Sequence, residues 1–372
     1  MMNRGFATIV TGILCFAMLI PAAFAVDSTA KLSDRDQQLH RQITAKGVAF
    51  LRKMQNEDGS FSPQLGPGIT ALTATALIRN GVPEQDPLVA KALRYVEQYV
   101  QADGGVYNPQ SQFNYNNYET SLAMMCFAEV KQERFADYLQ RGQAYIKKIQ
   151  WGGDLSDPAY GGAGYGKHKR PDLSNTTFFI EALKSSGIGA DDPDMQEALI
   201  FVSRCQNLES EHNTLPFNNK VSDGGFYYTG AAGGSSQAGQ TENGGLRSYG
   251  SMTYAGLKSM IYAGVDADDP RVKAAVSWIG KHYDLDSNPG MKLDGLYYYY
   301  HTFAKCLDAL GKDSIEDASG QNHAWRKELI EKLASKQQAN GSWVNDSDRW
   351  FEGDASLVTA YALLSLSYCD ND

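Results

Sequence analysis

The sequence predicts an all-α fold, a closed (α/α)6 toroid in which six inner helices alternate with six outer helices. Two observations lead to this prediction: a Gly–Asp–Pro segment recurs along the chain, and helices rich in small residues alternate with amphipathic ones. A closed ring of helix pairs needs no polar capping repeats at its ends, because every pair packs between two neighbours. Long loops are expected at one mouth, since the connections from Leu155 to Asn175 and from about Asn207 to Tyr249 are unusually long.

The recurring segments begin at Gly81, Gly187 and Gly264, and in each an Asp lies five residues later with Pro directly after it. Gly suits the end of one helix, Asp the N-cap of the next, and Pro the first helical position. The third segment contains the acidic spelling "DADD", which ends at Asp269. Because the other two copies lack the complete D-x-D-D pattern, we interpret "DADD" as a turn that ends in a capping Asp. A helix N-terminus also favours the Asp anion, whereas a proton donor needs a raised pKa.

Helices with many Ala, Gly, Ser and Thr residues are predicted for the inner ring, where small side chains let helices approach closely. They open at Thr70, Thr120, Thr176, Thr253 and Thr359, and a sixth starts at Tyr300. The segments 87–100 and 326–338 are amphipathic and are typical of the outer ring.

The first 25 residues predict a secretory signal peptide, because an apolar run follows Arg4 and ends at Ala23-Phe24-Ala25. We therefore expect residues 26–372 to form one exported toroid domain, periplasmic or extracellular. No segment has the roughly 20 apolar residues of a membrane-spanning helix. The net charge of −9 and the lack of a basic patch argue against nucleic acid as a partner. The oligomeric state stays open.

The cysteines outside the signal sequence include no C-x-x-C pair. They are Cys126, Cys205, Cys306 and Cys369. Buried free thiols are the favoured interpretation, and a disulfide, which export would permit, is the alternative.

A third repeated element has the pattern Q-x-x-x-G-x-W/F/Y. It occurs as Gln55-Gly59-Phe61, Gln337-Gly341-Trp343 and, in a weaker form, Gln101-Gly105-Tyr107. The pattern resembles the glutamine–tryptophan repeat of squalene and hopene cyclases, whose toroid is shared with protein prenyltransferase β-subunits. Physically, the Gln amide can satisfy loose backbone groups where an outer helix ends, while the aromatic ring packs over it.

The catalytic groups that this resemblance implies are missing. The cyclases' Asp-x-Asp-Asp acid has its only literal match in the turn that ends at Asp269. The segment "YYYYHTFAKCL" is similar to the histidine-bearing helix of the prenyltransferases and places His301 at a zinc-ligand position. Their Asp-x-Cys pair would fall near Tyr249 to Ser251, which offers no thiolate. Two of three protein ligands are therefore absent, and we expect no zinc and no other cofactor.

Polar and aromatic residues near the predicted N-termini of the inner helices would surround one mouth of the central cavity, the default place for a ligand. The candidate catalytic residues are His301, Asp354 and Glu119. The candidate ligand-binding residues are Tyr118, Asp172, Asn175, Tyr249, Tyr299 and Trp350. In the alternative interpretation Glu119, Asp172 and Asp354 cap helices and the tyrosines only pack. Of the run 298–300, at most one or two side chains can face the cavity from one helix.

The resemblance implies an exported squalene-cyclase/prenyltransferase-like repeat protein that binds an apolar or amphipathic, isoprenoid-like ligand in an aromatic pocket. Catalysis stays undecided, since the cyclase acid and the zinc pair are absent. One alternative is a polysaccharide lyase or hydrolase that acts on a glycan, because helical toroids also host such enzymes. The other is a non-catalytic toroid that binds a protein.

Overall fold

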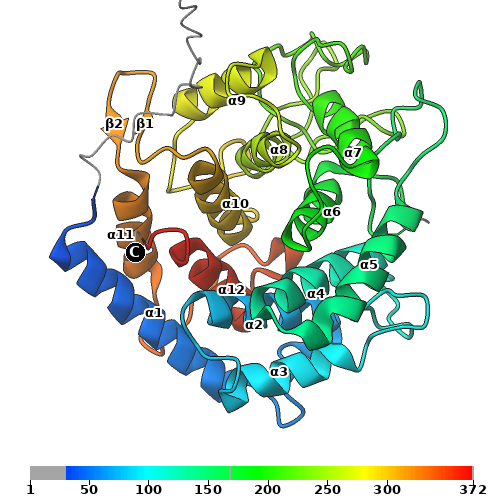
Figure 1. The fold of residues 1–372 in the computed structure, drawn as a ribbon. Coiled ribbons are helices and arrows are strands. Elements are labelled where there is room, and N and C mark those ends of the chain that lie inside the picture. The colour runs from blue at the N-terminus through cyan, green and yellow to red at the C-terminus, as the bar shows by residue number, and fades with distance from the viewer. Residues whose placement is uncertain (1–30, 167–168, 371–372) are drawn as a thin grey trace, which may run out of the picture.

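The computed structural model describes residues 31–166 and 169–370, which form twelve α-helices and one small β-hairpin. The inner helices are α2 (Pro67–Arg79), α4 (Asn116–Val130), α6 (Leu173–Ser185), α8 (Gly250–Tyr262), α10 (Leu296–Ala309) and α12 (Ala355–Leu366). The outer helices are α1 (Asp34–Met54), α3 (Pro87–Glu97), α5 (Ala136–Ile149), α7 (Pro193–Arg204), α9 (Pro270–Lys281) and α11 (Trp325–Lys336). The two sets form concentric rings (Figure 1), so the predicted all-α toroid is confirmed. The proposed signal peptide, residues 1–25, lies outside the described residues.

The inner ring closes on itself, because each inner helix packs against the next and α12 packs against α2. The inner helices are buried nearly all round; in α12, for example, every residue from Ser356 to Leu366 is buried. A helix without a polar face is stable only when other helices cover it on all sides. Between α10 and α11 lies the hairpin of β1 (Ile315–Glu316) and β2 (Asn322–His323). Short 3-10 turns are η1 (Pro63–Leu65), η2 (Glu133–Phe135) and η3 (Arg349–Phe351).

The capping role assigned to the recurrent Asp residues is confirmed. Asp86, Asp192 and Asp269 are the N-caps of α3, α7 and α9, and each carboxylate accepts a hydrogen bond from the amide two residues later. In "DADD", Asp268 is exposed and pairs with Lys273 at the surface.

We predict that Asp266→Asn combined with Asp268→Asn leaves the thermal midpoint unchanged, because neither carboxylate is buried. Asp269→Ala should cost about 0.5–2 kcal/mol, the usual effect of losing a cap. Thermal unfolding followed by circular dichroism checks both. A double variant that unfolds much earlier than the parent would contradict the turn interpretation.

A glutamine at the end of α1 and another at the end of α11 each connect their helix to the next outer helix. The Gln55 amide donates to the carbonyls of Gly59 (3.1 Å) and Leu88 (2.8 Å), and Gln337 donates to Gly341 (3.0 Å) and Ile43 (2.9 Å). The bonds to Gly59 and Gly341 fit the expectation that the amide satisfies backbone groups where an outer helix ends, and the bonds to the neighbouring outer helix were not predicted.

Two further glutamines, which are not part of a Q-x-x-x-G-x-W/F/Y motif, also connect an outer helix to the next outer helix. Gln150 donates to the carbonyls of Gly161 and Asp194, and Gln206 donates to those of Gly224 and Arg271. Inserted loops separate these glutamines from their glycines, so the spacing of four residues is lost.

The glycine of each fastening has a positive φ and lies against a carbonyl of the next outer helix. At Gly59, for example, φ is 95° and an added Cβ would lie 2.4 Å from the Lys91 carbonyl oxygen. Two residues later an amide donates to the threonine of the following inner helix, as Phe61 does to Thr70 (3.0 Å). The equivalent bonds elsewhere are Val106 to Thr120, Ala163 to Thr176, Phe226 to Thr253 and Trp343 to Thr359.

The weak third copy departs from its predicted register. The glycine with a positive φ is Gly104, and Val106 makes the bond to the inner helix. The expected residues, Gly105 and Tyr107, are each one position later, because Gln101 lies three residues before Gly104 and not four.

Candidate functional site

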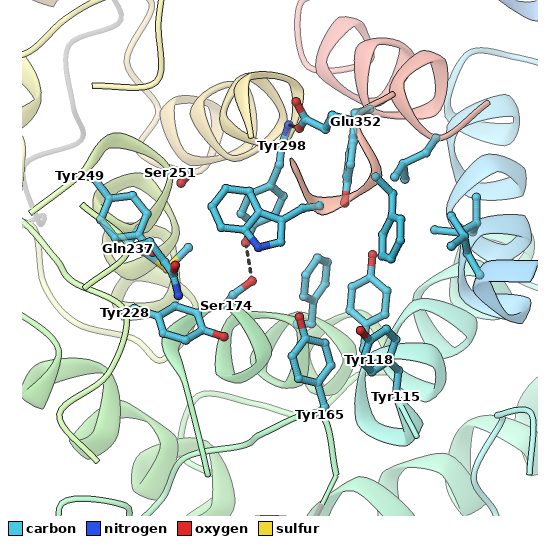
Figure 2. A pocket seen from close by; sticks show the side chains of 18 residues that line it. Tyr115, Tyr118, Tyr165, Ser174, Tyr228, Gln237, Tyr249, Ser251, Tyr298 and Glu352 are labelled. Carbon is cyan, nitrogen blue, oxygen red and sulfur yellow. Dashed lines mark hydrogen bonds between the residues drawn. The ribbon is translucent and has the colours of Figure 1, made fainter. Parts of the chain in front are cut away.

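A cavity of about 150 Å³ lies at the N-terminal ends of the inner helices (Figure 2). Every inner helix contributes a side chain from its first turns: Ile69, Tyr118, Ser174, Met252, Tyr298 and Leu357. The remaining wall comes from loops and from η3. The cavity therefore occupies the mouth at which the sequence places a ligand.

Aromatic side chains make most of the wall. The tyrosines are Tyr115, Tyr118, Tyr165, Tyr228, Tyr249, Tyr298 and Tyr361, joined by Phe178, Trp350 and Phe351. Tyr165 and Tyr228 direct their hydroxyls toward the interior (Figure 2). The hydroxyls of Tyr298 and Ser174 share a hydrogen bond of 3.1 Å. The wall thus combines flat apolar faces with hydroxyl groups.

Burial keeps these phenols protonated. It raises the pKa of Tyr118 to about 12, and it raises the pKa values of Tyr165, Tyr228 and Tyr298 further above the ordinary value. At neutral pH the tyrosines are therefore protonated, neutral hydrogen-bonding groups, because the phenolate form is not populated.

Glu352 is the only carboxylate among the described residues that line the cavity. Its Oε1 accepts from the Tyr298 amide (2.8 Å), and its Oε2 accepts from the Tyr297 amide (3.2 Å) and the Asn345 side chain (2.6 Å). Burial raises its pKa to about 7 although these bonds favour the anion. Both oxygens are thus engaged in capping α10, at the edge of the cavity (Figure 2).

The rim is made by η3, where the backbone is strained. Trp350 and Phe351 have φ values of 56° and 66°, a left-handed conformation that non-glycine residues seldom adopt. Both side chains are more than two-fifths exposed. Arg349 holds this turn in place: its guanidinium carbon lies 4.3 Å from the Trp350 ring centroid, and it donates to Asp294 (2.8 Å) and Gln237 (2.7 Å).

Three of the predicted ligand-binding residues line the cavity: Tyr118, Tyr249 and Trp350. Tyr299 does not, because its hydroxyl donates to the Asp284 carbonyl (2.7 Å) away from the cavity, and the neighbouring Tyr298 takes its place.

Asp172 and Asn175 lie behind the wall. Asp172 is the N-cap of α6, accepts from the amide and side chain of Asn175 (2.9 and 2.8 Å), and interacts with the Tyr228 hydroxyl. Burial raises the pKa of Asp172 to about 6. Asp172 therefore positions Tyr228, and Asn175 interacts with the Tyr165 hydroxyl; neither residue lines the cavity.

The three candidate catalytic residues also lie outside the wall. Asp354 is the N-cap of α12 and accepts from Ser62 (2.7 Å). Glu119 lies in the first turn of α4, where its Oε2 accepts from the Asn108 amide (3.1 Å); burial raises its pKa to about 7. His301 stacks on the cavity residue Tyr361 with ring centroids 6.0 Å apart. The structure does not bring these three side chains together.

His301 borders a buried ion cluster at the opposite end of the ring. There Glu181 of α6 pairs with both Lys258 of α8 and Lys305 of α10, and all three side chains are buried. Burial and the nearby Lys305 hold the pKa of His301 well below its ordinary value. The imidazole is therefore neutral at physiological pH.

Several wall residues were not predicted. Tyr115, Tyr165, Tyr228 and Gln237 come from loops, and Glu352 follows the strained turn. The aromatic content of the long loops was the one available signal, since "YGGAGY" and "GGFYY" stand out from their Gly-rich surroundings.

The described residues contain no group of three or more His, Cys, Asp or Glu side chains that could hold a metal ion. Among those same residues, no helix is long and apolar enough to cross a membrane. The four cysteines beyond the proposed signal peptide are buried and free, as the favoured interpretation has it.

Solved structures with this architecture include carbohydrate-active enzymes. A glycosidase variant in complex with glucose is similar over 91% of this chain and 99% of its own, with a TM-score of 0.54 and 11% identity. A polysaccharide lyase is similar over 90% of this chain and 97% of its own, with a TM-score of 0.54 and 8% identity. At these identities the similarity establishes the toroid fold alone.

A type II terpene cyclase from Scytonema, in complex with geranylgeranyl dihydroxybenzoate, aligns over 90% of this chain and 98% of its own, at 14% identity and a TM-score of 0.35. That overlay is too loose to support the cyclase-like specificity implied by the glutamine motif. No family model matches the chain. No curated protein matches it either.

Proposed function

We propose that this protein is an exported glycan-binding toroid that takes one sugar ring of its ligand into the aromatic cavity. The observation that carries the proposal is the size and chemistry of that cavity. A closed apolar space of about 150 Å³ holds a molecule the size of benzene, so the cavity of about 150 Å³ suits a single six-membered ring.

The wall offers both kinds of contact that a sugar ring uses. The apolar faces of the sugar ring can pack on the aromatic rings of Phe178 and Trp350. The hydroxyls of the sugar can hydrogen-bond to the neutral phenols of Tyr165 and Tyr228. A glycosidase bound to glucose and a polysaccharide lyase share the fold, which supports a glycan over other ring-shaped ligands.

An isoprenoid is the second candidate, because Leu65, Ile69, Met252 and Leu357 add an apolar strip to the wall. A farnesyl or longer chain would have to leave most of its length outside a cavity of this size. The phenol hydroxyls would also face an apolar chain that offers them no hydrogen bonds. Both points favour the glycan.

Binding is a better-supported role than hydrolysis. Hydrolysis of a glycoside generally uses two carboxyl groups on either side of the scissile bond. Among the described lining residues the cavity has Glu352 alone, and both of its oxygens cap α10.

The test is calorimetric titration of the full chain with neutral oligosaccharides of glucose, mannose, galactose and xylose, and separately with farnesol and geranylgeraniol. We expect saturable binding of at least one oligosaccharide, without release of shorter products, and none of the isoprenoid alcohols. Binding of the alcohols alone would overturn the proposal, and product release would replace binding by catalysis.

Trp350→Ala should weaken glycan binding by roughly thirtyfold. Truncating an aromatic side chain that the ligand covers typically costs about 2 kcal/mol or more of binding free energy. The variant's thermal midpoint should stay close to the parent's, because the Trp350 side chain is 42% exposed. Met54→Ala is the matched control, since Met54 is 46% exposed and belongs to the outer helix α1. Equal binding by the parent and Trp350→Ala would remove η3 from the site.

A further inference from the structure

Arg170, which contacts the cavity wall, belongs to a basic stretch of this otherwise acidic sequence. The chain carries a net charge of −9, yet residues 167–170 read "KHKR". Within the described residues, Lys169 and Arg170 are both exposed. The contacts proposed above for a neutral sugar ring do not use this charge.

Arg170 is tied to the cavity wall. Its guanidinium carbon lies 5.7 Å from the ring centroid of Tyr228, a lining residue, and its Nη2 donates to the Ser235 hydroxyl (3.1 Å). Two residues further along that loop, Gln237 lines the cavity and accepts from Arg349. The segment from Ser235 to Gln237 therefore joins two guanidinium groups, each stacked on an aromatic residue of the wall.

The two arginines differ in their charge partners. Arg349 forms an ion pair with Asp294 at 2.8 Å, which neutralises it. Arg170 forms no ion pair within 4.0 Å in the part of the chain that the structure describes. Asp172 interacts electrostatically with Arg170, but Asp172 is buried and already accepts hydrogen bonds from the amide and side chain of Asn175. One side of the rim thus presents an exposed guanidinium without a carboxylate of its own.

We propose that the glycan bound in this cavity is acidic, and that Arg170 binds an anionic substituent, a carboxylate or a sulfate, of the sugar ring that packs near Tyr228. The inference rests on the proposed glycan-binding function. A planar guanidinium matches a carboxylate or sulfate with two parallel hydrogen bonds, and its place over an aromatic face restricts its orientation. The acidic remainder of the protein would repel a polyanion elsewhere, which focuses binding on this rim.

The experiment compares charged and neutral forms of the same oligosaccharide by calorimetry on the full chain. The pairs are oligogalacturonate with its methyl ester, oligoglucuronate with its methyl ester, and a sulfated galactan fragment with its desulfated form. We expect the charged member of at least one pair to bind about tenfold more tightly at low salt, as one charge-assisted contact allows. The pair in which this occurs distinguishes carboxylate from sulfate.

Arg170→Gln should abolish the difference within that pair by weakening the charged member far more than the neutral one, whereas Arg170→Lys should keep part of the difference. Arg94→Gln is the matched control, since Arg94 is also exposed but belongs to the outer helix α3. If Arg170 only fastened the two loops, Arg170→Gln would weaken both members equally, and that result would overturn the inference. The inference would also be overturned if the charged and neutral members of every pair bound with affinities within twofold of each other. If no oligosaccharide binds at all, the proposed function fails as well.

Discussion

Replacing Glu181 with glutamine is expected to destabilise the protein by about 3–5 kcal/mol, the usual cost of removing one partner from a buried ion pair. Glu181 is the common carboxylate partner of Lys258 and Lys305, and the three side chains join α6, α8 and α10. The variant would leave two buried ammonium groups without a counter-charge. Urea denaturation at pH 7 measures the loss.

The pH dependence gives the same interaction a second signature. Burial alone would raise the pKa of Glu181, but the two ammonium groups outweigh it and hold that pKa below 4.5. The stabilisation is therefore fully present above pH 4.5 and is lost as the pH falls below it. In Glu181→Gln the lysines keep pKa values lowered by burial, so the unfolded chain binds more protons and stability should rise toward pH 10.5.

Glu129→Gln is the control for Glu181→Gln. Glu129 pairs with Arg79 near the same end of the ring, but its side chain is partly exposed, so its loss should cost about 1 kcal/mol or less. Equal losses in the two variants would show that burial of the Glu181 cluster is not what makes it strong.

Trp343→Ala is expected to cost about 3–5 kcal/mol, the range for deleting a large buried aromatic side chain. Trp343 has no exposed surface, its indole nitrogen donates to the Leu333 carbonyl (2.8 Å), and its ring packs against Gly47 of α1. The variant loses contacts between α11, α1 and α12, where the last helix pair meets the first. Denaturant unfolding and ligand binding should be measured together. A variant that unfolds like the parent but no longer binds glycan would move Trp343 from the framework into the site.

The ring architecture could be predicted because its determinants are local and repeated. A capping Asp after a Gly, or a Gln four residues before a Gly, is visible in a short window of sequence. The same fastening at Gln150 and Gln206 escaped notice, since the loop before Gly161 or Gly224 can vary in length while the hydrogen bonds stay the same.

The site could be predicted only in part, because it depends on the rotation of a helix and on loop conformation. Successive residues of a helix point about 100° apart, so a run of four tyrosines does not reveal that Tyr298 faces the cavity and Tyr299 does not. The left-handed turn at Trp350 and Phe351 has no glycine to mark it. Tyr228 enters from a loop that no periodic pattern constrains.

The most direct test of the glycan-binding account is a crystal structure of the full chain with its tightest-binding oligosaccharide. The account predicts one sugar ring inside the cavity, stacked on an aromatic face and hydrogen-bonded to the phenols of Tyr165 or Tyr228. A sugar bound only on the outer helices, with the cavity empty or filled by an isoprenoid chain, would contradict it.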